Sequence, residues 1–270
     1  MIAPLSWWAQ PAPLIPWIAG ILTMNMTANM ALAAARAGLC LVVSPLLRLT
    51  RRRSSDSPRG LYVFLHGWGS RPFIWNLWAL WAQVRGWDYL VPHLSSELSA
   101  QENAAMVREM IQCSGHTNIR MVSTSNGSVV GILVGDYPHR ALAPAIGGAL
   151  PPRPLLDLII PEHMSHLIEG SPLNEHYVEM ARGYKNLHCV YGNQDAYVRQ
   201  MEGVRVRGWD HHGISSIPTE SDWLLNAVGW LVPLVALPVY WLVGAWGWIL
   251  PMGVHMFKPV TRAVAAGVLG

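Results

Sequence analysis

Charged residues are scarce in this sequence. Only 13% of its 270 residues are Asp, Glu, Lys or Arg, whereas about a quarter are charged in a typical soluble domain. The formal net charge of +3 is small, and the longest run of basic residues is Arg51-Arg52-Arg53. Nucleic-acid binding needs a larger basic surface, so the composition speaks against a nucleic-acid partner.

Cysteine is also scarce. The chain has Cys40, Cys113 and Cys189, an odd number at wide spacing. This pattern suggests neither a disulfide framework nor a zinc site. His163 and His166 have a spacing that could hold a metal on a helix, but we interpret them as ordinary surface residues, and no cofactor is expected. No repeat of about 20–50 residues is present, which excludes a solenoid.

The low content of charged residues is explained in part by an apolar N-terminal segment. Residues 13–47 contain one charged side chain, Arg36. A membrane-spanning helix needs about twenty mostly apolar residues, and residues 17–35 or 30–49 could supply it, the first window being favoured. Residues 1–53 are therefore predicted to form a membrane anchor rather than a cleaved signal, because no basic residues precede the apolar stretch. Residues 54–60 read as a linker.

A second apolar segment ends the chain. Leu231 to Leu250 carry no ionisable residue and are predicted to span the membrane, so that residues 230–270 form a second anchor with an interfacial tail. Arg48 and Arg51 to Arg53 then place the domain between the anchors on the positive side of the membrane, the cytoplasm or matrix. Membrane lipid is thus an expected partner.

Between the anchors, short apolar runs alternate with helical patterns. The runs that read as strands are 61–65, 88–91, the segment beginning at 119, 141–146, 187–191 and 204–207, and the helical patterns include 72–81, one opening at the Ser99 to Glu102 capping box, 129–134 and 220–228. This alternation predicts an α/β domain over residues 61–229, with a mostly parallel sheet and helices on both faces. Residues 151–182 interrupt it and are predicted to be a lid-like insertion.

One strand and turn carry a possible nucleophile. Ser123-Thr124-Ser125-Asn126-Gly127 fits the pattern small-x-nucleophile-x-Gly, in which a sharp strand-to-helix turn pushes the central hydroxyl outward. Ser125 is the candidate nucleophile. Serine needs a base and an orienting acid, in the order serine, acid, histidine. Asp195 and then His211 or His212 follow in that order, each just after a predicted strand.

A glycine-rich turn follows the first predicted strand, His66-Gly67-Trp68-Gly69. Backbone N–H groups in such a turn can stabilise an oxyanion, and we predict the N–H groups of Trp68 and Asn126 for this role. His66 is interpreted as holding the turn by hydrogen bonding rather than as an acid or base. No metal is required by this chemistry.

These segments resemble the α/β-hydrolase superfamily, and within it the lipase and serine-esterase group that includes GPI-inositol deacylase-like enzymes. The resemblance covers residues 60–228 and rests on five segments: 65–69, 123–127, 168–173, 192–195 and 210–214. It implies hydrolysis of an ester, commonly of a lipid, through an acyl-enzyme on Ser125. It also favours His211 over His212, because in such lipases the base commonly follows an aspartate directly, as His211 follows Asp210.

Two other functions fit the same sequence. The chain could be a catalytically degenerate structural subunit of a membrane complex, because polar residues inside the first apolar segment, such as Asn29 and Arg36, usually face protein. Ser123 and Ser128, which stand where the lipase pattern has glycines, also leave that reading open. The same triad could instead serve an acyltransferase.

Overall fold

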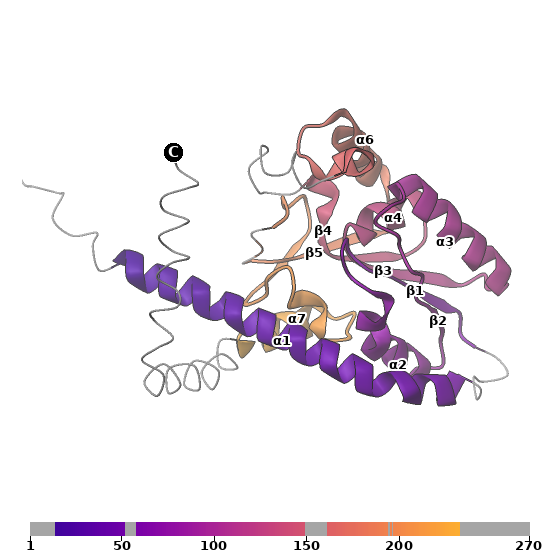
Figure 1. Cartoon of the computed structure of the whole chain (residues 1–270), viewed down its shortest axis with the longest axis horizontal. Helices are drawn as coiled ribbons and strands as arrows, with labels where there is room; N and C mark the ends of the chain where they lie inside the picture. The colour runs from indigo at the N-terminus through magenta and orange to yellow at the C-terminus, as the bar shows by residue number, and fades with distance from the viewer. Residues whose placement is uncertain (1–13, 52–57, 149–160, 194, 196, 233–270) are drawn as a thin grey trace, which may run out of the picture.

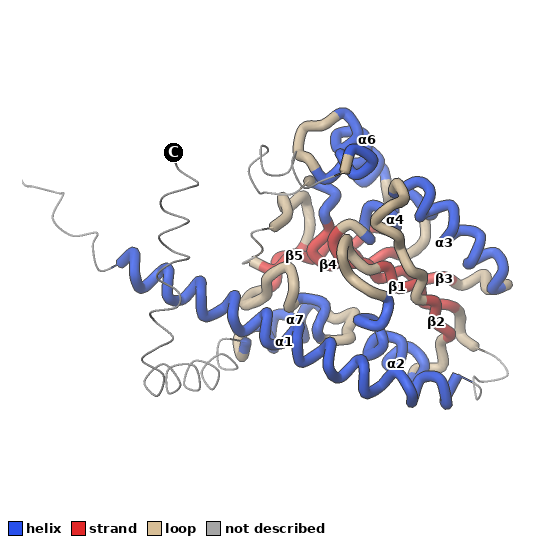
Figure 2. Tube along the Cα trace, viewed as in Figure 1, coloured by secondary structure: helices blue, strands red, loops and turns tan. Residues whose placement is uncertain are grey.

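The chain folds around one parallel sheet with helices on both faces (Figures 1 and 2). The computed structural model describes residues 14–51, 58–148, 161–193, 195 and 197–232. Its strands are β1 (Leu61–Leu65), β2 (Asp88–Leu90), β3 (Ile119–Ser125), β4 (His139–Pro144), β5 (Leu187–Gly192) and β6 (Val204–Val206). They pair in the order β2-β1-β3-β4-β5-β6, and every pair is parallel. This confirms the predicted parallel α/β sheet.

Two layers of helices cover the sheet. The helices are α1 (Leu14–Arg51), α2 (Asn76–Val84), α3 (Ala100–Ser114), α4 (Gly127–Val134), α6 (Pro172–Gly183) and α7 (Asp222–Gly229), with 3-10 turns η1 (Pro72–Trp75), η2 (Ala145–Gly147), η3 (Glu162–Leu167) and η4 (Ile214–Ser216). α2, α7 and the outer helix α1 pack on one face, and α3, α4 and α6 pack on the other. Each face of the sheet is therefore buried.

Strand β1 shows how the sequence produces this layering. All five of its residues are buried. Tyr62 and Phe64 point into the core beneath α2, whereas Leu61, Val63 and Leu65 point into the core beneath α3 and α4. Successive side chains of a strand alternate between faces, so a continuous apolar run is what a strand covered on both sides requires.

The helix boundaries follow their sequence signals. At the start of α3, the Ser99 hydroxyl accepts a hydrogen bond from the Glu102 N–H while the Glu102 carboxylate accepts one from the Ser99 N–H, which confirms the predicted capping box. The strand predicted at residues 141–146 was placed wrongly at both ends. β4 begins at His139 and ends at Pro144, because residues 145–147 turn into η2.

Helix α1 is continuous from Leu14 to Arg51 and passes along the outside of the α2 layer (Figure 1). Its stretch Ala28–Leu47 is long and apolar enough to cross a membrane. That stretch overlaps the second of the two predicted windows more fully than the favoured one. Most of the second predicted span, residues 233–250, lies outside the described residues, as do residues 151–160 of the predicted lid.

Candidate active site

Ser125 occupies a sharp turn between β3 and α4. Its φ of 52° lies in the left-handed region that non-glycine residues rarely adopt. Ser125 is the last residue of β3, and α4 begins two residues later at Gly127. The predicted strand-turn-helix geometry of a nucleophile elbow is present, since a residue in this conformation directs its side chain away from both elements.

The elbow packs directly on the glycine-rich turn after β1. A Cβ on Gly127 would stand 2.5 Å from the Leu65 carbonyl oxygen, and a Cβ on Gly67 would stand 2.8 Å from the Ser125 Cβ. Neither position has room for a side chain. The absence of a side chain at both positions therefore lets the backbone of the turn approach the Ser125 side chain closely.

His66 holds this turn in place. The Leu94 N–H donates to His66 Nε2 at 3.0 Å, so Nε2 carries the lone pair and Nδ1–H donates to the Gly67 carbonyl at 2.9 Å. Burial lowers the pKa of His66, which keeps the ring neutral as this arrangement requires. Trp68 and Gly69 follow, Trp68 being partly exposed and Gly69 having a φ of 70°. These two hydrogen bonds connect the Gly67 and Leu94 backbones through the His66 ring.

Asp195 and His211 form a hydrogen-bonded pair at the same edge of the sheet. His211 Nδ1 lies 3.1 Å from Asp195 Oδ2, and the Asp195 side chain is fully buried. Its other oxygen, Oδ1, accepts hydrogen bonds from the N–H groups of Tyr197 and Val198. A carboxylate so placed fixes the ring orientation and tautomer of the imidazole and leaves His211 Nε2 free to act as a base.

His212 has a different environment. Its ring packs against Tyr197, with centroids 4.9 Å apart, and no carboxylate bonds to it within the described residues. Asp210, which precedes the two histidines, accepts the N–H groups of His212 and Gly213 through Oδ1, at 2.8 Å each. Asp210 therefore shapes the turn, and the geometry distinguishes the two histidines where the spacing of the residues could not.

The nucleophile and the base are not joined in this structure. Within the described residues no hydrogen bond links the Ser125 hydroxyl to His211. Catalytic hydrogen bonds are often long in the absence of substrate, and both residues lie at the edge where the parallel strands end. The structure thus contains two separate contacts. The acid bonds to the histidine, and the elbow packs on the glycine-rich turn.

A buried chain of side chains lies beneath the elbow. His139 Nε2 is 2.6 Å from Ser123 Oγ, and Ser123 donates to Ser128 Oγ at 2.8 Å. All three side chains are buried. Burial lowers the pKa of His139 to about 3, so the ring is neutral and donates from Nε2–H. This chain gives a physical reason for serines at the two positions where the lipase pattern has glycine.

His166 was missed by the sequence reasoning. It is buried rather than on the surface, and its Nε2 lies 2.7 Å from Asn126 Oδ1. Asn126 follows the nucleophile and is the predicted oxyanion donor. Asn174 in turn binds the carbonyls of His166 and Ile146, which fastens η3 to the turn after β4. The histidine content of residues 163–166 was the visible signal, but its partner lies 40 residues away.

His163 and His166 do not converge on a metal. His163 Nε2 bonds to the Ser96 carbonyl, while His166 points to Asn126. In the part of the chain that the structure describes, no group of three or more His, Cys, Asp or Glu side chains has a metal-binding arrangement.

Helix α1 contacts the loop that carries the base. Asn29 Nδ2 donates to the Gly208 carbonyl at 3.0 Å, and Arg36 Nη1 donates to Ser215 Oγ. The indole N–H of Trp78 on α2 donates to the Ser215 carbonyl. The bonded residues Gly208 and Ser215 lie before and after His211 in the sequence. Asn29 and Arg36 of α1 therefore face protein, as intramembrane polar groups were expected to do, and that protein is the domain itself.

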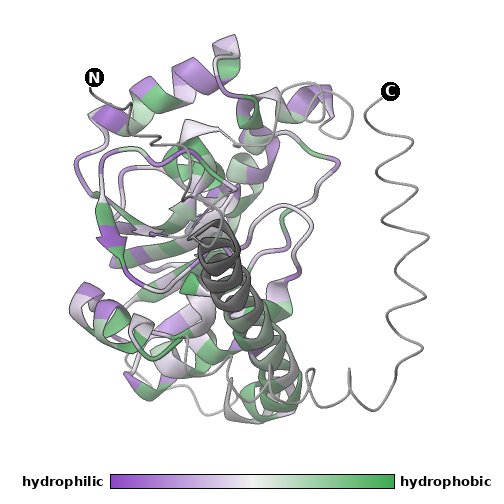
Figure 3. Cartoon of the chain, turned by 90° about the vertical axis from the view of Figure 1, so that its left-hand side faces the viewer, coloured by the Kyte–Doolittle hydropathy of each residue, from purple (hydrophilic) through white to green (hydrophobic). Residues whose placement is uncertain are grey.

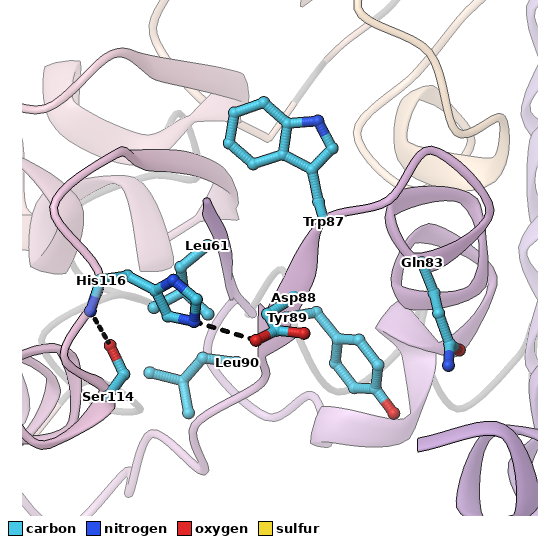
Figure 4. Close-up of a pocket in the computed structure, with 8 residues that line it drawn as sticks. All are labelled: Leu61, Gln83, Trp87, Asp88, Tyr89, Leu90, Ser114 and His116. Carbon is cyan, nitrogen blue, oxygen red and sulfur yellow. Dashed lines mark hydrogen bonds and ion pairs between the residues drawn. The ribbon is translucent and has the colours of Figure 1, made fainter. Parts of the chain in front are cut away.

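A pocket at the opposite edge of the sheet contains another histidine and aspartate (Figure 4). It is lined by Leu61 and Asp88, where β1 and β2 begin, and His116 Nε2 bonds to Asp88 Oδ2 at 2.9 Å. Ser114 Oγ accepts from the His116 backbone N–H, not from the ring. This trio therefore lacks a base placed to activate the serine.

The similarity of this chain to known proteins lies in its fold. No protein-family model matches the sequence, and no curated protein matches it. Solved structures to which the fold is similar include α/β-hydrolases. The monoacylglycerol lipase of Paleococcus ferrophilus aligns with 66% of this chain and 96% of its own, at 14% identity and a TM-score of 0.48.

Two further structures give similar values. Est1E of Butyrivibrio proteoclasticus, solved with ferulic acid, aligns with 68% of this chain and 90% of its own, at 12% identity and a TM-score of 0.42. An α/β-hydrolase fold protein from Burkholderia ambifaria aligns with 64% of this chain and 90% of its own, at 12% identity and a TM-score of 0.39.

Proposed function

We propose that this chain is a serine hydrolase that cleaves a carboxylic ester through an acyl-enzyme on Ser125. The observation that carries the proposal is the pairing of the buried Asp195 with the partly accessible His211, held 3.1 Å apart at the same sheet edge as the strained Ser125 elbow. A serine, an acid and a base in this order at strand ends is the arrangement that activates a hydroxyl.

In the proposed reaction, His211 Nε2 takes the proton of Ser125 as Oγ attacks the ester carbonyl. The negative charge that develops on the carbonyl oxygen is stabilised by the N–H groups of Asn126 and Trp68. His211 then gives its proton to the departing alcohol, which leaves the acyl group on Ser125. A water molecule, deprotonated by the same ring, then attacks the acyl carbonyl; the bond to Ser125 Oγ breaks, His211 returns the proton to Oγ, and the carboxylic acid is released.

A lipid ester is the substrate class we propose. It rests on the apolar helix α1, whose stretch Ala28–Leu47 could hold the protein at a membrane. Asn29 and Arg36 on this helix also support the loop of the proposed base. A substrate that partitions into the bilayer would be concentrated at the same membrane that holds the enzyme.

The test is labelling of the full-length, detergent-solubilised protein with a fluorophosphonate probe, which reacts with activated serines. We expect labelling of the wild type, none of Ser125→Ala, and little of His211→Ala. Ser128→Ala is the matched control, because Ser128 lies within the same turn but its hydroxyl is buried beneath it. A folded wild type that fails to label would favour the structural-subunit alternative.

A further inference from the structure

The exposed surface of α1 is apolar, which is the reverse of the usual arrangement for a helix that faces water. Between Ala28 and Leu47, no exposed side chain carries a polar group; these residues are Met30, Ala34, Ala35, Gly38, Leu39, Leu41, Val42, Pro45 and Leu46. We call this set the outer face of α1; Figure 3 shows the apolar colouring of the helix. A helix that faces water places its polar residues outward. The outer face is therefore adapted to a medium other than water.

The polar residues of the same stretch bind the domain. Besides Asn29 and Arg36, Cys40 Sγ donates to the Ile74 carbonyl at 3.3 Å, and Asn76 Nδ2 donates to Ser44 Oγ at 2.6 Å. These contacts run from position 29 to position 44, which corresponds to about 22 Å of helix at about 1.5 Å per residue. The helix is fixed along the side of the domain over that whole length.

This docking is incompatible with a bilayer crossing by the same stretch. A hydrocarbon core is about 30 Å thick, so a crossing at residues 29–44 would carry the docked loop with Asp210 and His211 into the hydrocarbon. It costs free energy to place ionisable side chains such as these in hydrocarbon, whether they are buried in the protein or partly exposed. The part of α1 before Asn29, Leu14 to Ala28, is shorter than the roughly twenty residues a span needs.

Features at both ends of the outer face favour lipid over a protein partner. The sequence immediately after Leu47 contains Arg48 and Arg51 to Arg53, which suits the phosphates of an anionic membrane. Near the other end, Gly229 packs against Gly208, the residue that Asn29 binds. The next residue, Trp230, is 61% exposed and packs under the Arg207 guanidinium. Tryptophan and arginine are enriched at the headgroup level.

We propose that the outer face of α1 lies in the surface layer of an anionic lipid bilayer, with the helix parallel to the membrane plane. The remainder of α1 continues past the edge of the sheet where Ser125 lies (Figure 1), so bound lipid lies beside the proposed active site. This deepens the proposed function by naming the surface that meets lipid, and it replaces a crossing by this helix with an in-plane contact.

Depth measurement tests the geometry. A cysteine is introduced singly at Met30, Val42 or Leu46 in full-length Cys113→Ser protein, in which the remaining native cysteines, Cys40 and Cys189, are buried. Each is labelled with an environment-sensitive fluorophore and reconstituted in phosphatidylcholine–phosphatidylserine vesicles. Lipids brominated near the headgroup or deep in the acyl chain then quench the label. We expect strong quenching by the shallow lipid at all three positions, with no steady change of depth along the helix from Met30 to Leu46.

The control is a label at Leu98, an exposed apolar residue in the loop just before α3, which should not be quenched. A depth that changes steadily from Met30 to Leu46 would show a crossing helix and overturn the proposal. Absence of quenching at all three positions would mean that a protein or solvent covers the face, which also overturns it. Fluorophosphonate labelling of the same samples reports separately on Ser125.

Discussion

The histidines near Ser125 belong to two contrasting regions. In the loop after β6, His211 is paired with the carboxylate of Asp195 and is partly accessible. Beneath the elbow, His66, His139 and His166 are almost completely buried and bond to neutral groups. Burial lowers the pKa of His139 to about 3 and that of His166 to about 4.

The comparison shows that the partner decides what a histidine can do. An imidazole beside a carboxylate can accept a proton, because the positive charge is stabilised. A buried imidazole with neutral partners stays uncharged and can serve as a hydrogen-bond donor that holds a loop. Proximity to Ser125 in the sequence does not distinguish the two cases, since His139 lies closer to Ser125 along the chain than His211 does.

The largest expected effect is at the base. His211→Ala should lower kcat/KM for a short-chain nitrophenyl ester about 10³–10⁴-fold, because loss of a triad member removes general-base catalysis. His212→Ala should change it only a few-fold. His116→Ala is the control, since that ring also bonds to an aspartate, but at the opposite edge of the sheet. A greater loss in His212→Ala would reverse the assignment.

The second effect is the pH dependence of stability. Because the folded-state pKa values of His139 and His166 lie below the unfolded value of about 6.5, the unfolded chain binds more protons between those limits. Stability should therefore fall as the pH drops from about 6.5 toward 4, by roughly 2 kcal/mol per histidine at pH 5. Urea midpoints at pH 7 and pH 5 measure this.

The variant His166→Gln sharpens that test. Glutamine retains an N–H donor for Asn126 but does not titrate, so the variant should lose less stability between pH 7 and pH 5 than the wild type. An unchanged pH slope in His166→Gln would show that this histidine is not buried and neutral as described.

The third effect concerns the chain under the elbow. Ser123→Ala leaves the His139 Nε2–H donor without a partner in the core, which should cost about 1–3 kcal/mol of unfolding free energy. Denaturant unfolding measures the loss. The double variant Ser123→Ala/Ser128→Ala should lose little more, because the two hydroxyls bond to each other. A gain of stability in Ser123→Ala would contradict this picture.

The smallest effect is at the proposed oxyanion donor. His166→Ala should lower kcat about tenfold with little change in KM, because Asn126 loses the bond that orients it and the oxyanion forms only in the transition state. His166→Gln should restore most of the rate. His163→Ala, on the same 3-10 turn, serves as the control. A rise in KM alone would indicate a role in substrate binding instead.

Much of the fold could be predicted because its signals are local. The five apolar residues from Leu61 to Leu65 form β1, and the Ser99 to Glu102 pair caps α3. The turn at Ser125 was also predicted, because the small residues that flank it let the strand and the helix approach closely. Such patterns depend on neighbours within a few residues along the chain.

The candidate site was predictable only in part. The order of Ser125, Asp195 and the two histidines is written in the sequence, but the direction of each ring is not. Asp195 faces His211 because the Asp210 turn and the bonds from α1 fix the loop between residues 208 and 215. His166 escaped notice because its partner, Asn126, belongs to another element.

The sequence by itself determined the alternation of strands and helices, the elbow, and the apolar character of α1. These depend on periodicity, turn chemistry and composition, which a linear chain displays. Only the tertiary structure decided which histidine meets the acid, why serine replaces glycine at position 123, and which side of α1 is apolar. Those outcomes depend on contacts such as Asn29 to Gly208, between residues 179 positions apart, and packing alone brings such residues together.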